Sequence, residues 1–177
     1  MRYRFILLFL LGFGWVTAQV YTPLNASSRV SFKIRNFGTT VEGTMSGLKG
    51  TIRFDASTIS SAQFDVTLDA NTIDTGINMR DNHLRKKDYF DVAFYPSIRF
   101  VSKKVTSVKA GEASVTGILT IKKKSKEITF PFKYTLLNGV PQFSAEFVIN
   151  RRDFTVGGSS VTMSDDVKIV LSVSTSK

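Results

Sequence analysis

Alternation between apolar and polar residues is the feature of this sequence that most constrains its fold. Val30, Phe32 and Ile34, for example, alternate with polar or charged neighbours. Side chains point to opposite faces in turn along a β-strand, so such a run sets one face against an apolar interior and the other in water. The runs cover residues 29–35, 62–70, 128–134, 143–149 and 167–173, with shorter ones at 41–45, 52–54, 98–100 and 115–121. They predict about eight strands and an all-β fold.

Turn and bend signals between the runs favour an antiparallel sheet that closes into a barrel. Asn138-Gly139 separates two alternating runs and is a preferred pair for a tight type I′ hairpin. Gly43, Gly47 and Gly50 recur within one long strand pair, where glycine marks the bulges and bends that let a sheet close. No repeat, low-complexity tract or linker divides the chain. We therefore expect a single domain over residues 19–177, an eight-stranded antiparallel β-barrel.

One segment breaks the alternation. Residues 78–87 contain helix formers without a period of two, and the chain then runs to Tyr95-Pro96. Proline disfavours α geometry in the residue before it, so a helix here ends before Pro96. The sequence predicts a short helical segment between two strands, with apolar residues that cap one end of the barrel.

The first 18 residues differ from the rest. Arg2 and Arg4 form a basic start, residues 5–11 are apolar, and small residues precede a cut after Ala18. This pattern is typical of a secretory signal, and the run is short of the roughly 20 apolar residues that a membrane anchor needs. We expect residues 1–18 to be a cleaved signal peptide and the mature protein to be periplasmic or secreted.

Composition narrows the chemistry. The chain has no cysteine, which excludes disulfides, thiolate metal sites and cysteine nucleophiles. Loss of Arg2 and Arg4 with the signal lowers the net charge from +10 to +8. The remaining charge is dispersed over outward strand faces, and no exposed aromatic ladder accompanies it. We therefore expect no nucleic-acid partner.

Candidate catalytic groups are few. His83 is the one histidine, and no nucleophile elbow, phosphate-binding loop or dinucleotide fingerprint occurs. Asp81 and Asp88 lie near His83, but a polar segment supplies such neighbours by chance. No spacing typical of metal ligands is present. We predict a protein without catalytic residues, metal or cofactor.

The barrel interior suggests a binding function instead. An eight-stranded barrel is wide enough to be filled by its own side chains or to hold one small ligand. A chain of about 16 carbons, at roughly 0.8 kcal/mol per methylene, gains on the order of 13 kcal/mol on burial. Association costs roughly 4–15 kcal/mol, so micromolar binding is within reach without catalytic machinery. Alternation alone does not decide between a filled core and a cavity.

Two basic clusters stand apart from the dispersed charge. One comprises Arg80, His83, Arg85, Lys86 and Lys87 in the helical segment. The other, residues 122–126, holds four lysines at the end of a hairpin. Either suits an anionic head group or an acidic membrane surface, although a solubilising turn also explains the lysines. Peripheral membrane contact and a homodimer both stay open.

A succession of short motifs resembles the YceI family. The glycine-rich stretch 41–55 resembles the family's early strands, and Ile73-Asp74-Thr75-Gly76 followed by residues 80–85 resembles its central signature. Further motifs follow in the family's order at residues 88–92, 95–100, 117–121 and 164–167. Together they extend from about Ser28 to Val173, nearly the whole mature chain.

The resemblance implies a lipocalin-like barrel that binds a long apolar amphiphile, either a polyisoprenoid or a fatty-acyl derivative. It also places the central segment at the ligand pocket. The residues expected at the head group or mouth are Arg80, Asp81, His83 and Arg85. The residues expected around the apolar tail are Phe32, Phe64, Val66, Leu84, Phe90, Phe94 and Phe100.

Two positions depart from the family's usual pattern. Lys122-Lys123-Lys124 stand where a glycine usually follows the Leu-Thr-Ile strand, and Thr155 follows Asp153-Phe154 where a glycine is common. Both departures fall in loops.

Our leading hypothesis is thus an exported lipid-binding carrier. Three alternatives are a non-catalytic stress or structural protein of the periplasm, a lipid-modifying enzyme with His83 as base, and an outer-membrane barrel. The last is disfavoured because Arg29, Lys33 and Arg35 share one face of a strand, and such charges at mid-depth cost about 2–4 kcal/mol each in a bilayer.

Overall fold

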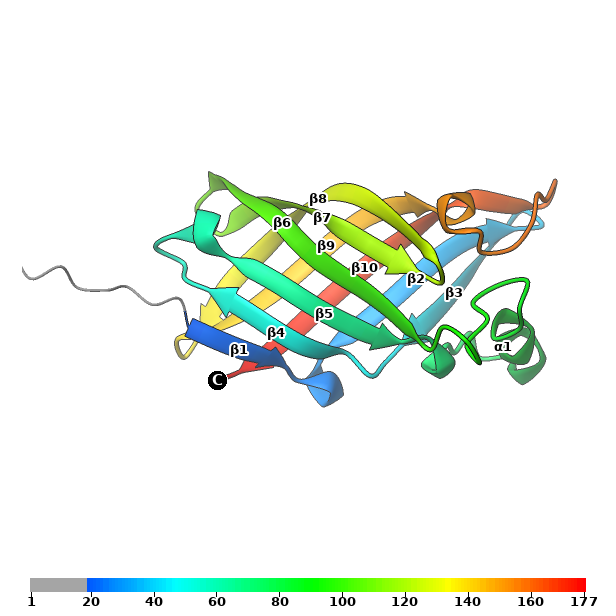
Figure 1. The fold of residues 1–177 in the computed structure, drawn as a ribbon, viewed down its shortest axis with the longest axis horizontal. Helices are drawn as coiled ribbons and strands as arrows, with labels where there is room; N and C mark the ends of the chain where they lie inside the picture. Colours follow the sequence, from blue (N-terminus) through cyan, green and yellow to red (C-terminus); the bar gives the residue numbers. More distant parts are fainter. Residues whose placement is uncertain (1–18) are drawn as a thin grey trace, which may run out of the picture.

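A computed structural model describes residues 19–177, which form a twisted antiparallel barrel (Figure 1). The expected signal peptide lies outside the described residues. The strands are β1 (Gln19–Pro23), β2 (Arg29–Asn36), β3 (Thr39–Met45), β4 (Lys49–Phe54), β5 (Gln63–Asp69), β6 (Ser97–Lys109), β7 (Glu112–Ile121), β8 (Lys124–Leu137), β9 (Val140–Asn150) and β10 (Met163–Ser176). One α-helix, α1 (Asn78–Leu84), lies between β5 and β6. Short 3₁₀ turns occur at Asn25–Ser27, Ile59–Ser61, Ala70–Thr72 and Arg151–Phe154.

The ten strand segments make eight barrel strands, because each of the two strands of the first hairpin is interrupted once. β1 pairs with β4 and β2 pairs with β3, so β1–β2 and β3–β4 are two long strands with a break in each. Asn25 holds the two breaks together, since its Oδ1 accepts bonds from the backbone N–H of Gly47 at 2.6 Å and of Leu48 at 3.1 Å. Gly47 adopts φ +74°, a left-handed conformation that favours glycine.

Pairing of the first and last strands closes the sheet. β10 pairs with β2 over most of its length and with β1 at its end, where Thr22 lies opposite Ser176. Each barrel strand therefore has two neighbours, and the expected eight-stranded antiparallel barrel is confirmed.

The alternation predicts the inward face correctly. Phe130 and Phe132 of β8 and Phe143 of β9 are buried, as are alternate residues of β7. One end of the barrel is filled by aromatic side chains. Phe54 packs edge-on against Tyr134 and Phe143 at 5.0 Å between ring centroids, and Phe64 packs against Phe143 at 5.5 Å. We call this the closed end.

The opposite end carries the long connections, and we call it the mouth end. In Figure 1 it holds α1, the β2–β3 turn and the connection that precedes β10. A backbone bond from the N–H of Gly157 to the carbonyl of Asp88, at 2.8 Å, joins two of these connections. The helix that was expected within residues 78–87 is present but ends at Leu84.

A hairpin turn is predicted from the sequence only where its residues are typical of tight turns. Asn138 and Gly139 have φ of 52° and 78° between the paired Leu137 and Val140, which confirms the tight turn. Phe37-Gly38 makes a similar turn, with φ of 48° and 75°, although phenylalanine gives no such signal.

Strand lengths were underestimated. β6 continues to Lys109, beyond the predicted 98–100, because its pairing with β7 shifts register between Ser102 and Lys104 and so breaks the alternation. β1 was missed, since its five residues are too few to establish a period. Within residues 19–177, no helix has the length and apolarity to cross a bilayer.

Gly117 in β7 offers a test of the packing. An added Cβ would lie 2.5 Å from both Cζ of Phe100 and the carbonyl oxygen of Val101. We expect Gly117→Ala to lower the free energy of unfolding by about 1–3 kcal/mol, measured by denaturant titration, because the Val101 carbonyl belongs to the paired backbone of β6 and cannot move aside without disturbing the β6–β7 pairing. Gly158→Ala is the matched control, since nothing lies within 4 Å of its added Cβ. Equal stability of the two variants would contradict the packing described.

Candidate functional site

An apolar cavity of about 260 Å³ occupies the mouth half of the barrel. Its wall is built from the inward residues of most strands, which the alternation of the sequence directs there. Ile34 of β2, Leu68 of β5 and Ile169 of β10 are representative. α1 and the segment that follows it contribute Leu84, Tyr89 and Phe90, which roof the cavity from one side.

A second apolar cavity, of about 100 Å³, lies between the first and the closed end. The two share wall residues, among them Phe100 and Phe130. Phe130 stacks on Phe147 at 4.1 Å between centroids and lies 5.4 Å from Phe100. These three rings, Phe100, Phe130 and Phe147, form an aromatic layer between the two spaces.

A larger hollow, of about 530 Å³, lies elsewhere and is mainly polar. It occurs where the backbone pairing of β5 with β6 stops at Asp65 and Val101, beyond which the Ser102 hydroxyl accepts from the N–H of Phe64 at 2.8 Å. Its wall includes Asp65, whose pKa is held below its ordinary value by hydrogen bonds from Arg99. Because charged and hydroxyl side chains line it, we take the inner apolar cavity as the candidate site.

Arg80 is the basic residue that the central segment places at the mouth of the cavity. Its Nε donates to the hydroxyl of Thr75 at 2.7 Å and its Nη2 donates to the Thr75 carbonyl at 2.8 Å. Asp81 fixes Thr75 in turn, because its Oδ1 accepts from the Thr75 backbone N–H at 2.9 Å and from the hydroxyl at 2.5 Å. Asp81 is buried and acts on the mouth through Thr75.

Arg85 and His83 stand away from the cavity lining. Arg85 donates to the carbonyls of Asn71 and Ile73, both at 2.8 Å, and so fastens the end of α1 to the segment that precedes it. His83 packs edge-on against Tyr89 at 5.0 Å between centroids. Among residues 19–177, no three His, Asp or Glu side chains gather in a way that could hold a metal ion.

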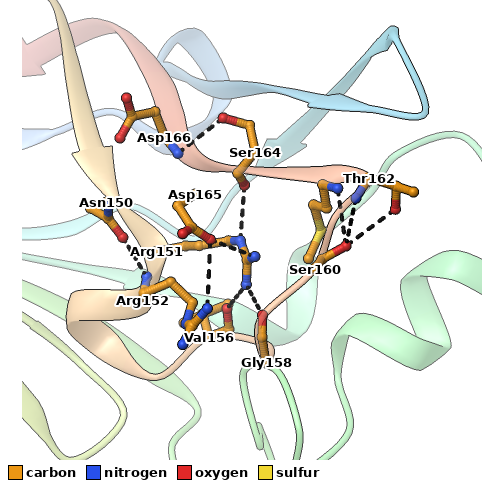
Figure 2. A network of polar contacts seen from close by, with 11 residues as sticks. Asn150, Arg151, Arg152, Val156, Gly158, Ser160, Thr162, Ser164, Asp165 and Asp166 are labelled. Atoms are coloured by element: carbon orange, nitrogen blue, oxygen red, sulfur yellow. Dashed lines mark hydrogen bonds and ion pairs between the residues drawn. The ribbon is translucent and has the colours of Figure 1, made fainter.

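Arg151 is a buried arginine in the cavity wall, with 4% of its side chain exposed. Figure 2 shows it enclosed by the connection that leads into β10. Its Nη2 donates to Asp165 at 2.7 Å and its Nε donates to the Ser164 carbonyl at 3.0 Å. Its Nη1 donates to the carbonyls of Val156 and Gly158, both at 2.9 Å. One side chain therefore shapes this whole side of the mouth.

The sequence of this barrel matches a known protein family. A family model described as the YceI-like domain matches residues 21–175. Protein YceI of Salmonella arizonae is 32% identical over 153 residues, which cover 81% of this chain and 78% of the relative. The chain belongs to the YceI family.

Solved structures share the fold. BcnA of Burkholderia cenocepacia has a TM-score of 0.82 at 26% identity, with 88% of this chain and 99% of BcnA covered. A domain of Saccharophagus degradans, described as a polyisoprenoid binding domain implicated in plant cell wall breakdown, has a TM-score of 0.69 at 16% identity. That match covers 88% of this chain and 97% of the domain.

The two departures from the YceI pattern have a structural explanation. Lys122 and Thr155, where the resemblance leads us to expect glycine, both adopt φ of 54°, the left-handed conformation that glycine takes easily. The Lys122 Nζ donates to the carbonyls of Thr155 and Lys87, both at 3.1 Å. The departures are thus coupled: the longer side chain at one position ties down the backbone at the other.

Most of the predicted tail residues of this YceI barrel do meet in the cavity wall. The larger cavity is lined by Phe32, Val66, Leu84, Phe90 and Phe100. Phe64 lines the smaller cavity and the polar hollow, but not the larger cavity. Phe94 lines neither apolar cavity and is 79% exposed, so its contact with a ligand stays a prediction. Its backbone N–H donates to the carbonyl of Asp91 in a turn, and the alternation that directs side chains inward along a strand does not apply there.

Only one of the four predicted head-group residues borders the cavity. Arg80 alone lines the cavity, whereas Asp81, His83 and Arg85 do not. Contact of any of them with a ligand stays a prediction. Arg151 was missed, although it continues the inward series Phe143, Phe147 and Ile149 of β9 by two residues. That series was a usable signal for it.

Removal of the Arg151 side chain tests its role at the mouth. We expect Arg151→Met to lower the free energy of unfolding by about 1–3 kcal/mol in a thermal or denaturant scan, because buried carbonyls lose their donor. Arg152→Met is the control, since Arg152 is 41% exposed and reaches Asp165 only at 4.0 Å. It should stay within about 0.5 kcal/mol of the parent. Equal losses would mean that the Arg151 contacts contribute no more than a surface charge.

Proposed function

We propose that this YceI protein is an exported carrier that holds one long apolar amphiphile, a polyisoprenoid or fatty-acyl derivative, inside the barrel. The observation that carries the proposal is the apolar cavity of about 260 Å³ in the mouth half of the barrel. Its wall is almost entirely hydrocarbon and aromatic, so a polar substrate would lose its hydration without replacement. An alkyl or isoprenoid chain loses nothing comparable and gains from leaving water.

The size of the cavities favours a long, narrow ligand. Small-molecule pockets usually measure about 300–1,000 Å³, and the larger cavity falls just short of that range. The second cavity of about 100 Å³ continues it along the barrel axis. A flexible chain is the ligand shape that fits two such spaces in line.

The polar end of the amphiphile belongs at the mouth. Arg80 lines the cavity there, and its Nη1 donates to no partner within the described part of the chain. An anionic or strongly polar head group beside this guanidinium would keep its hydration and gain a charge-assisted hydrogen bond.

Family membership supports the proposal from a separate direction. The domain of Saccharophagus degradans that shares this fold is described as a polyisoprenoid binding domain, so a barrel of this shape suits a ligand of the proposed class. Export is proposed from the signal-like residues 1–18 alone. We assign no chemistry to His83, which stands outside the cavity lining.

A bulky substitution in the wall tests the binding site. We expect Ile169→Trp to weaken the binding of a fluorescent fatty acid, such as parinaric acid, by at least about tenfold, because the indole occupies the ligand's space. Val170→Trp is the matched control, since position 170 faces outward on the same strand between Ser31 and Glu146. If both variants bind the probe like the parent, the cavity is not the lipid site.

The aromatic layer sets the length of chain that fits. We expect Phe130→Ala to join the two cavities and to raise the affinity for octadecanoate relative to dodecanoate, in competition against the same probe. Phe132→Ala is the control, because Phe132 lines the smaller cavity but not the larger one. Both substitutions remove a buried ring at a cost of about 3–5 kcal/mol, so stability does not separate them. An unchanged ratio in the Phe130 variant would exclude the layer as the length limit.

A further inference from the structure

Large apolar side chains are exposed at the rim of the mouth. Phe37 is 76% exposed, Met79 82% and Phe94 79%, while Val161 is fully exposed. Barrel packing does not explain them, because each stands outside the inward series of a strand. We call these four residues the rim. Exposed residues of this size gathered around a ligand site mark a contact surface.

The rim residues belong to segments that border the cavity itself. Asn36 and Met163 line the cavity, next to Phe37 and close to Val161 in the chain. A bond from the Phe37 N–H to the Thr162 carbonyl, at 3.0 Å, holds these two tips together. On the other side, Met79 precedes Arg80, which also lines the cavity. Phe94 lies in the same connection between β5 and β6, four residues beyond Phe90, which also lines the cavity. The rim residues therefore belong to the connections on both sides of the entrance.

Positive charge gathers at the same end. The connecting segments of the mouth end, residues 35–40, 70–97, 120–126 and 150–166, hold eleven Lys and Arg against seven Asp. The corresponding segments of the closed end, residues 54–63, 107–113, 135–142 and 174–177, hold two Lys against one Asp and one Glu. The closed end also exposes apolar residues, Val108, Leu136 and Leu137, but without this excess of positive charge.

We propose that the mouth end docks on the surface of an anionic lipid bilayer. The rim side chains enter the head-group region, and the exposed Lys86, Lys87, Lys123 and Lys124 contact lipid phosphates. Amphipathic surfaces of this composition bind membranes through apolar burial together with attraction to anionic lipids. A second copy of the chain is a poorer occupant, because two such basic faces repel each other.

Docking would place the cavity entrance directly over the acyl chains. That consequence rests on the proposed carrier function, whereas the docking itself rests on the rim and its charge. Lipid could then pass between bilayer and barrel without crossing open water, which is the costly part of its transfer.

A single tryptophan reports docking directly, because Trp15 is the only tryptophan of the chain. In a Trp15→Phe background, Phe37→Trp places an indole on the rim, and Leu137→Trp places one at the closed end, where Leu137 is 63% exposed. Vesicles of equal phosphatidylglycerol and phosphatidylcholine should shift the emission of the first variant to the blue and leave the second unchanged. Added salt should reverse the shift by screening the lysines.

A second variant separates docking from carriage. Phe37→Ser combined with Met79→Ser should weaken co-sedimentation with the anionic vesicles by about tenfold while bound amphiphile, measured by mass spectrometry, is retained. The proposal is overturned if position 37 and position 137 respond alike, or if neither responds. It is also overturned if the indole at position 37 shifts with protein concentration in the absence of vesicles, since that result assigns the rim to contacts between copies. Vesicle binding by a protein whose cavity proves empty would contradict the carrier function and leave docking intact.

Discussion

Closure of the sheet is the constraint on which the rest of this structure depends. Because β10 pairs with both halves of the β1–β2 strand, the barrel has no free edge, and every inward side chain must share one enclosed space. The interruption of the first hairpin at Asn25 and Gly47 lets two long strands bend around that space. An open sheet would expose its Phe-rich face to water. A closed barrel must either fill its interior with side chains or leave room for a ligand.

This barrel does both, and the division is made by ring packing. At the closed end, Phe54, Phe64 and Phe143 pack edge to face and leave little space. Toward the mouth, rings lie against glycine. A Cβ on Gly43 or Gly117 would overlap the ring of Phe32 or Phe100, so these phenylalanines lie close to the wall because no side chain is beneath them. The glycines thereby keep open a lumen that the same number of aromatic residues would otherwise fill.

Much of this could be predicted from sequence, and the limits are physical. Period-two alternation identifies the strands, their inward faces and most of the cavity wall, because each strand obeys it independently of its neighbours. It fails at β6, where a bulge shifts the phase, and at Phe94, which belongs to a turn. The bonds of Arg151 to Ser164 and Asp165 reach 13 and 14 residues along the chain, and the bond of Lys122 to Thr155 reaches 33, so no local pattern reveals them. Whether the interior was filled or open likewise depended on how rings from different strands meet.

The inner cavity, as proposed above, holds an apolar chain. Native mass spectrometry of the protein, purified without detergent from its own source, can detect such a bound chain. We expect one additional mass of lipid size per chain, which disappears after extraction with organic solvent and which Ile169→Trp prevents. A protein that carries no such mass, and that accepts no polyisoprenoid or fatty acid when these are added, would contradict the proposal.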